Sequence, residues 1–180
     1  MRHSRAGSVT STKRTTDVGA SVDAFRRILR ELRVRARKGE LATGLSPAQI
    51  FVLSAVADRP GASVNDIAAE TMTDRSSVAA VIDRLVEQGY ALRGQSTEDA
   101  RRAAVTITAR GRRAMRRAAP PPTAVLIASI RALSRDERRG LAAGLTALAH
   151  AMGIGGEPPG MLFEDAPQRK RSRRGGTKPV

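Results

Sequence analysis

The chain has 180 residues, which is enough for one domain with extensions at its ends. Lysine and arginine outnumber aspartate and glutamate by 32 to 17, and this net charge of +15 favours a polyanionic partner such as nucleic acid. The absence of cysteine excludes disulfides, thiolate metal sites and cysteine-based redox sensing. The scarcity of aromatic residues, three Phe and one Tyr, disfavours a protein that binds single strands by stacking bases on aromatic side chains.

The first 38 residues divide into an arm and a helix. Residues 1–20 are polar and without periodicity, and they predict a disordered basic arm with no secretory signal. Apolar residues then recur at three- and four-residue steps, which predicts a helix over about 21–38 that ends near Gly39. Its apolar stripe consists of Val22, Phe25, Leu29 and Leu32.

Three shorter helices follow in quick succession. Ser46 and Gln49 form a capping box around Pro47, which predicts a helix that ends at Arg59-Pro60-Gly61. Ser63 and Asp66 begin a second helix, and Thr73-Asp74 begins a third that ends at Gly89. The third helix directs four apolar residues towards the core: Val78, Val81, Ile82 and Leu85.

Two short strands come next, at residues 90–94 and 103–107, with a polar turn between them. Thr108 then begins a helix through about Ala118, and Pro120 to Pro122 interrupt it. Ser134 caps a last helix with an apolar stripe at Leu141, Leu145, Leu148 and Met152. Residues 153–180 predict a disordered basic tail.

This order of elements predicts a mainly α fold with a small β-wing. A winged helix-turn-helix domain occupies about 46–110, within a larger unit of 21–152. The helices at about 21–38 and 109–152 are expected to form a dimerisation region. Each end of the chain carries a charge of +3, so +9 remains on residues 21–152, and the basic character belongs to the folded part.

The third short helix is the expected DNA-reading element. Arg75, Ser76 and Ser77 stand at its leading end, where a guanidinium and hydroxyls can bond base edges in the major groove. Ala79 and Ala80 allow close approach without hydrogen bonding, and Arg84 suits a phosphate. The alternative is that Arg75 and the serines only cap and solvate a helix end.

The turn between the strands carries a second candidate contact. Arg101 is expected to enter the minor groove, with its guanidinium oriented by Asp99. Arg93 and Arg102 are expected to contact phosphates. The alternative is a surface hairpin held by an ion pair.

These segments together resemble the MarR family of bacterial transcriptional regulators. The resemblance rests on LSPAQIFVLSAVAD, on SVNDIAAETMTDRSSVAAVIDRLVEQGY and on the wing EDARRAAVTITARG, and it covers about residues 22–152. It implies a homodimer joined through its first and last helices, a pseudo-palindromic DNA operator, and release by a small, often phenolic, anion. Two features depart from the family pattern: the alanines at 79 and 80, and the prolines at 120–122.

The sequence therefore predicts a cytoplasmic, dimeric DNA-binding repressor without membrane contact. No apolar run reaches the ~18 residues of a membrane span. His3 and His150 are isolated, no phosphate-binding glycine loop follows a strand, and no pattern indicates an enzyme, a cofactor or a metal. No residue is assigned to an effector. Two alternatives stay open: an architectural protein that coats DNA without sequence preference, and a winged-helix protein-interaction module.

Overall fold

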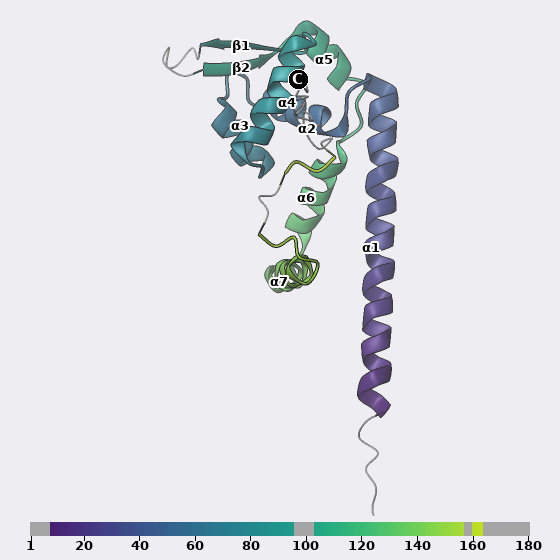
Figure 1. The fold of residues 1–180 in the computed structure, drawn as a ribbon. Coiled ribbons are helices and arrows are strands. Elements are labelled where there is room, and N and C mark those ends of the chain that lie inside the picture. The colour runs from purple at the N-terminus through teal and green to yellow at the C-terminus, as the bar shows by residue number, and fades with distance from the viewer. Residues whose placement is uncertain (1–7, 96–102, 157–159, 164–180) are drawn as a thin grey trace, which may run out of the picture.

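The computed structural model describes residues 8–95, 103–156 and 160–163 (Figure 1). It is mainly helical with one two-stranded antiparallel sheet, which confirms the predicted fold class. The elements in chain order are α1 (Ser8–Thr43), α2 (Pro47–Asp58), α3 (Val64–Thr71), α4 (Arg75–Glu87), β1 (Ala91–Gln95), β2 (Ala103–Ile107), α5 (Ala109–Met115), α6 (Pro122–Ala132) and α7 (Arg135–Ala151).

Helix α2 forms the centre of the fold. Its predicted capping box is present: the Gln49 amide donates to the Ser46 hydroxyl at 3.2 Å, and the Ser46 amide donates to Gln49 Oε1 at 3.0 Å. Val52, Leu53 and Val56 are completely buried. Because α2 buries side chains on all sides, α3, α4, α5, α6 and β2 can pack around one helix.

The sheet is joined to the helices by main-chain hydrogen bonds. Arg93 pairs with Val105 in the antiparallel register of β1 and β2. On its other side, Val105 accepts from the Gly61 amide at 3.2 Å and donates to the Ala62 carbonyl at 2.9 Å. The loop between α2 and α3 therefore extends the ladder and holds the wing against the helix-turn-helix.

A single threonine connects the end of α4 to the end of the wing. The Thr108 hydroxyl donates to the Gly89 carbonyl at 2.8 Å and accepts from the Gly111 amide at 3.0 Å. It thereby caps α5 and binds the turn after α4. Gly111 lies against this turn, where a Cβ would stand 2.3 Å from the Tyr90 carbonyl oxygen.

Helix α1 is longer than the sequence predicts, and it extends well beyond the rest of the fold (Figure 1). It begins at Ser8, within the segment predicted as a disordered arm, and no proline interrupts residues 8–21. It passes Gly39 and ends at Thr43, and Gly44 takes the positive φ of 74°. Gly39 stays helical where a Cβ would stand 2.9 Å from Ile50 Cδ1, so its lack of a side chain lets α2 approach.

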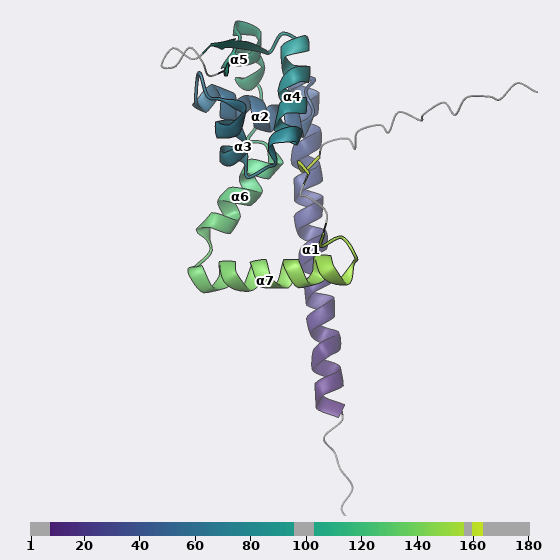
Figure 2. The same cartoon turned by 60° about the vertical axis from the view of Figure 1, so that its left-hand side comes forward.

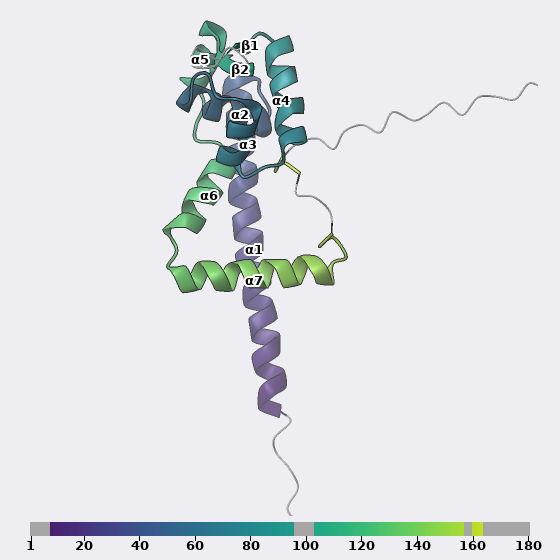
Figure 3. The same ribbon diagram turned by 90° about the vertical axis from the view of Figure 1, so that its left-hand side faces the viewer.

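The three prolines separate α5 from α6, as predicted. Pro121 has φ −62° and ψ 146°, an extended conformation, and α6 begins at Pro122. Helix α6 packs on α1 and α2. Helix α7 then runs roughly perpendicular to α1, as Figures 2 and 3 show, and none of its side chains is buried.

Part of the expected C-terminal tail packs on the domain. Met161 is 6% exposed and belongs to the core cluster that contains Leu45, Val56 and Val81. Met161, Leu162 and Phe163 form an apolar run in the otherwise polar tail, and the unbranched methionine fits an irregular gap.

Within the described ranges, no single helix is long and apolar enough to cross a membrane. The helical segments Thr16–Thr43 and Pro47–Asp58 are long and apolar enough only when they are taken together, and a bend of 72° separates them. The second of these helices is the buried core helix α2.

We predict that Gly111→Ala destabilises the protein by about 1–3 kcal/mol, because the new methyl group overlaps the Tyr90 carbonyl and the Ile107 side chain. Gly140→Ala is the matched control: this helical glycine has open space around it, so alanine is expected to be neutral or to stabilise α7 by about 0.5–1 kcal/mol. Urea unfolding of both variants measures the difference. Equal stability of the two variants would contradict the close packing at Gly111.

Candidate nucleic-acid interface

The leading end of α4 is organised by Asp74. Its carboxylate accepts from the Ser77 amide at 2.9 Å, which caps the helix, and from the Ser76 hydroxyl at 2.5 Å. The Ser76 hydroxyl, followed by the Ser77 hydroxyl and amide, lowers the pKa of Asp74 from 3.8 to about 2. The first turn of α4 is therefore a rigid, hydrogen-bonded unit with an ionised carboxylate at its base.

The two faces of α4 differ sharply. Val78, Val81, Ile82 and Leu85 are completely buried, as the periodicity predicts. Arg75 and Ser76 are exposed and Ser77 is half-buried, so the leading turn projects two of the three predicted reading residues into solvent. Ala80 is also exposed, and its small side chain leaves the next turn open to a close partner.

The second half of α4 has a different electrostatic character. Arg84, a predicted phosphate contact, is half-buried, whereas Asp83 and Glu87 are exposed. The Glu87 carboxylate would repel a phosphate, whereas Asp83 is paired with Arg93. The exposed acidic side chains thus lie on the second half of α4, and its exposed arginine, Arg75, lies on the leading turn.

Arg93 connects the wing to α4. It lies on β1, and its Nη2 atom stands 2.5 Å from Asp83 Oδ1. Both side chains are substantially exposed, so the pair adds little to stability. Sequence reasoning identified Arg93 but not its partner, because the two residues belong to different elements. Asp99, Arg101 and Arg102, the other predicted wing residues, lie outside the described residues.

A second basic group, which sequence reasoning missed, lies on α5 and the turn that follows it. Arg110 stacks on the Tyr90 ring, with its guanidinium carbon 4.5 Å from the ring centroid. The group consists of Arg110, Arg112, Arg113, Arg116 and Arg117, and all five are exposed. Five arginines in eight residues without an acidic residue were a visible signal in the sequence.

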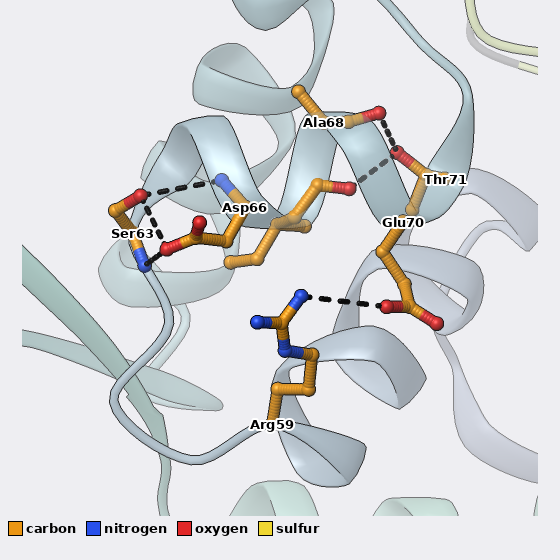
Figure 4. Close-up of polar contacts among 7 residues, drawn as sticks. Arg59, Ser63, Asp66, Ala68, Glu70 and Thr71 are labelled. Atoms are coloured by element: carbon orange, nitrogen blue, oxygen red, sulfur yellow. Dashed lines mark hydrogen bonds and ion pairs between the residues drawn. The ribbon is translucent and has the colours of Figure 1, made fainter.

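A shallow cavity of about 150 Å³ lies between α2, α3 and α6. Phe51 and Ile127 supply apolar walls, and Asp58, Glu70 and Arg131 supply charge. Figure 4 shows the α3 side of this region, where Arg59 Nη1 approaches Glu70 Oε2 at 3.7 Å and the Ser63–Asp66 capping box begins the helix. No group of three His, Asp or Glu residues in the part of the chain described here is placed to hold a metal ion.

The order α2, α3, α4, β1, β2 with a capped, solvent-facing α4 defines a winged helix-turn-helix protein. Residues 43–102 match the MarR family model. A putative transcriptional regulatory protein for the hcr operon of Thauera aromatica is 30% identical over 99 residues, which are 48% of this chain and 60% of that protein. The likeness to the MarR family thus covers residues 43–102, which include α2, α3, α4 and β1.

Two solved structures are similar in outline. BpsR of Bordetella bronchiseptica has 21% identity and a TM-score of 0.48, with 83% of this chain and 98% of that chain covered. CouR of Rhodococcus jostii RHA1 has 22% identity and a TM-score of 0.47, with 81% and 96% covered.

We predict that the Asp74 carboxylate contributes stability above its ordinary pKa of 3.8 and that this contribution is lost as pH falls through about 2. The sign follows from the lowered pKa, because the unfolded chain takes up the proton first. Asp74→Asn keeps a capping side chain but does not titrate. The melting temperature of wild type relative to this variant should be constant above about pH 4 and fall below it. A difference that is flat or rises on acidification would contradict the assignment.

Proposed function

We propose that this protein is a dimeric, sequence-specific DNA-binding regulator, most simply a cytoplasmic repressor that occludes a promoter. The observation that carries the proposal is the leading turn of α4, where Arg75 and Ser76 are exposed on a rigid capped helix beside the wing. Selection of bound duplexes from a random pool, at stated salt, tests it. Recovery of an inverted repeat is the expected result.

Each of the predicted DNA-contact residues has a role in this proposal. Arg75, Ser76 and Ser77 read base edges in the major groove. Arg101, oriented by Asp99, enters the neighbouring minor groove, and Arg84, Arg93 and Arg102 contact phosphates. The charge distribution of α4 supports an approach in which the helix N-terminus enters first. The ion pair with Asp83 implies that Arg93 exchanges one anionic partner for another on binding.

The exposed apolar faces of α1 and α7 support a dimer. Phe25 is 46% exposed on α1, and Leu145 is 45% exposed on α7. Helix α7 buries no side chain within the described part of the chain, so its apolar stripe is available to a second copy. A two-fold dimer would present two α4 helices roughly 34 Å apart, which matches successive major grooves.

The cavity between α2, α3 and α6 is a candidate effector site, because it touches both the reading domain and α6. Arg131 would attract a small anion against the opposing charge of Asp58, and Phe51 would pack on a phenolic ring. Glu70 is already paired with Arg59. BpsR is regulated in its DNA binding by 6-hydroxynicotinic acid, and CouR has been crystallised with p-coumaroyl-CoA. Titration of the complex with aromatic acids tests for release of DNA.

A second candidate function is architectural DNA coating without sequence preference. The five exposed arginines from Arg110 to Arg117 and the net charge of +15 favour it. Random-pool selection separates the two functions, because a coating protein enriches no sequence. A protein-interaction module would bind no duplex with useful affinity at physiological salt.

We predict that Arg75→Ala weakens binding to the selected site by about 1–3 kcal/mol and relaxes the preference at one base position. Arg93→Ala serves for comparison: it should weaken binding to all duplexes alike and flatten the salt dependence. Affinities for selected and random duplexes over a range of salt concentrations measure both effects. If Arg75→Ala lowers both affinities equally, Arg75 is a phosphate contact.

We predict that Leu145→Asp shifts the protein from a dimer towards its 19.2 kDa monomer and weakens operator binding. The physical reason is that a carboxylate in an apolar interface loses hydration without a partner. Ala143→Asp places the same charge on the opposite, exposed face of α7 and should leave the dimer intact. Sedimentation equilibrium at micromolar concentration decides the outcome, and a monomeric wild type would refute the dimer.

A further inference from the structure

The hydroxyl group of Ser76 has a restricted hydrogen-bonding capacity. A serine hydroxyl has one proton to donate and two lone pairs that accept. In this structure the Ser76 Oγ atom lies 2.5 Å from Asp74 Oδ1. An ionised carboxylate only accepts, so the proton of this bond must come from Ser76. The hydroxyl therefore presents lone pairs alone to anything that approaches from solvent.

Two observations make this orientation persistent. The pKa of Asp74 is about 2, so the carboxylate carries no proton at neutral pH. The carboxylate is also held in place by the Ser77 amide at 2.9 Å, which is the cap of α4. Turning the Ser76 proton outward would break a charge-assisted hydrogen bond, and such bonds are roughly twice as strong as neutral ones.

A hydrogen-bond acceptor in the major groove distinguishes bases that present an exocyclic amine there from bases that present a carbonyl oxygen. Adenine presents its N6 amine there and cytosine presents its N4 amine, whereas guanine and thymine present carbonyl oxygens. Phosphate oxygens also only accept. A carbonyl or phosphate oxygen opposite Ser76 would place two acceptors together, with neither of them satisfied.

We propose that Ser76 is a specificity residue that accepts a hydrogen bond from the exocyclic amine of adenine or cytosine, because Asp74 holds its hydroxyl proton. This inference rests on the proposed function, since it requires the leading turn of α4 to enter the major groove. Ser76 then contacts a base rather than a phosphate, and Asp74 acts as a positioning residue. Arg75 can only donate hydrogen bonds, so it would bind acceptor atoms on the neighbouring base edge.

The test uses the full chain and the duplex recovered by selection. Each adenine of one half-site is replaced in turn by purine, and each cytosine by pyrimidin-2-one, so that one exocyclic amine is removed at a time. Wild type should lose at least about fivefold in affinity at the position that Ser76 reads. Ser76→Ala should show no loss at that position and an unchanged loss elsewhere. Because both proteins meet the same altered duplex, the effect of the weakened base pair cancels.

Two further variants make the test specific. Asp74→Asn retains the capping oxygen that accepts from both Ser76 and Ser77, but this oxygen is neutral, so the bond that holds the Ser76 proton loses its charge assistance. This variant should discriminate less than wild type against guanine or thymine at the same position, with the affinity ratio between the original and the replaced base reduced by at least about twofold. Ser21→Ala is the matched control, since Ser21 is an exposed helical serine on α1 that bonds only its own helix. It should behave as wild type.

The outcomes separate the inference from the proposed function. If Ser76→Ala loses affinity equally on every duplex and flattens the salt dependence, Ser76 is a phosphate contact and the inference is overturned. If it remains as sensitive as wild type to every amine, Ser76 reads no base and the inference is again overturned. If the wild type enriches no sequence at all, the proposed function fails, and the inference fails with it.

Discussion

The burial of α2 is the constraint on which the rest of the structure depends. Nine of its twelve residues are buried, including its capping glutamine, so the helix has no solvent-facing stripe and must be covered on every side. Helices α3, α4, α5 and α6 and strand β2 supply that cover. The position of the leading turn of α4 is consequently set by contacts to one central helix, and a change in the α2 core would move this turn and the wing together.

Helix starts could be predicted from the sequence because their hydrogen bonds are local. Ser46, Ser63 and Ser134 each bond a residue three positions later, and a window of four residues contains all the information. The use of Gly39 inside α1 depends on a distant contact, because Ile50 of α2 occupies the space where a Cβ would stand. The burial of Met161 likewise requires a pocket that other segments build.

The candidate interface likewise contains features that local sequence predicts and features that depend on distant contacts. The exposure of Arg75 and Ser76 follows from helical periodicity, and the sequence predicts it. The pairing of Arg93 with Asp83 joins a strand to a helix ten residues away, and periodicity carries no information about it. The direction of the Ser76 proton is a still finer property. It depends on which oxygen of Asp74 the helix cap orients, and only atomic distances define it.

The proline break between α5 and α6 has a mechanical consequence. A continuous helix transmits twist along its axis, whereas the prolines between α5 and α6 end the hydrogen-bond ladder and turn the chain, with Pro121 in an extended conformation. The chain thus reaches α7 through α6, and the unbroken α1 packs beside α6. Two helices packed side by side, α1 and α6, resist tilting more strongly than a single hinge.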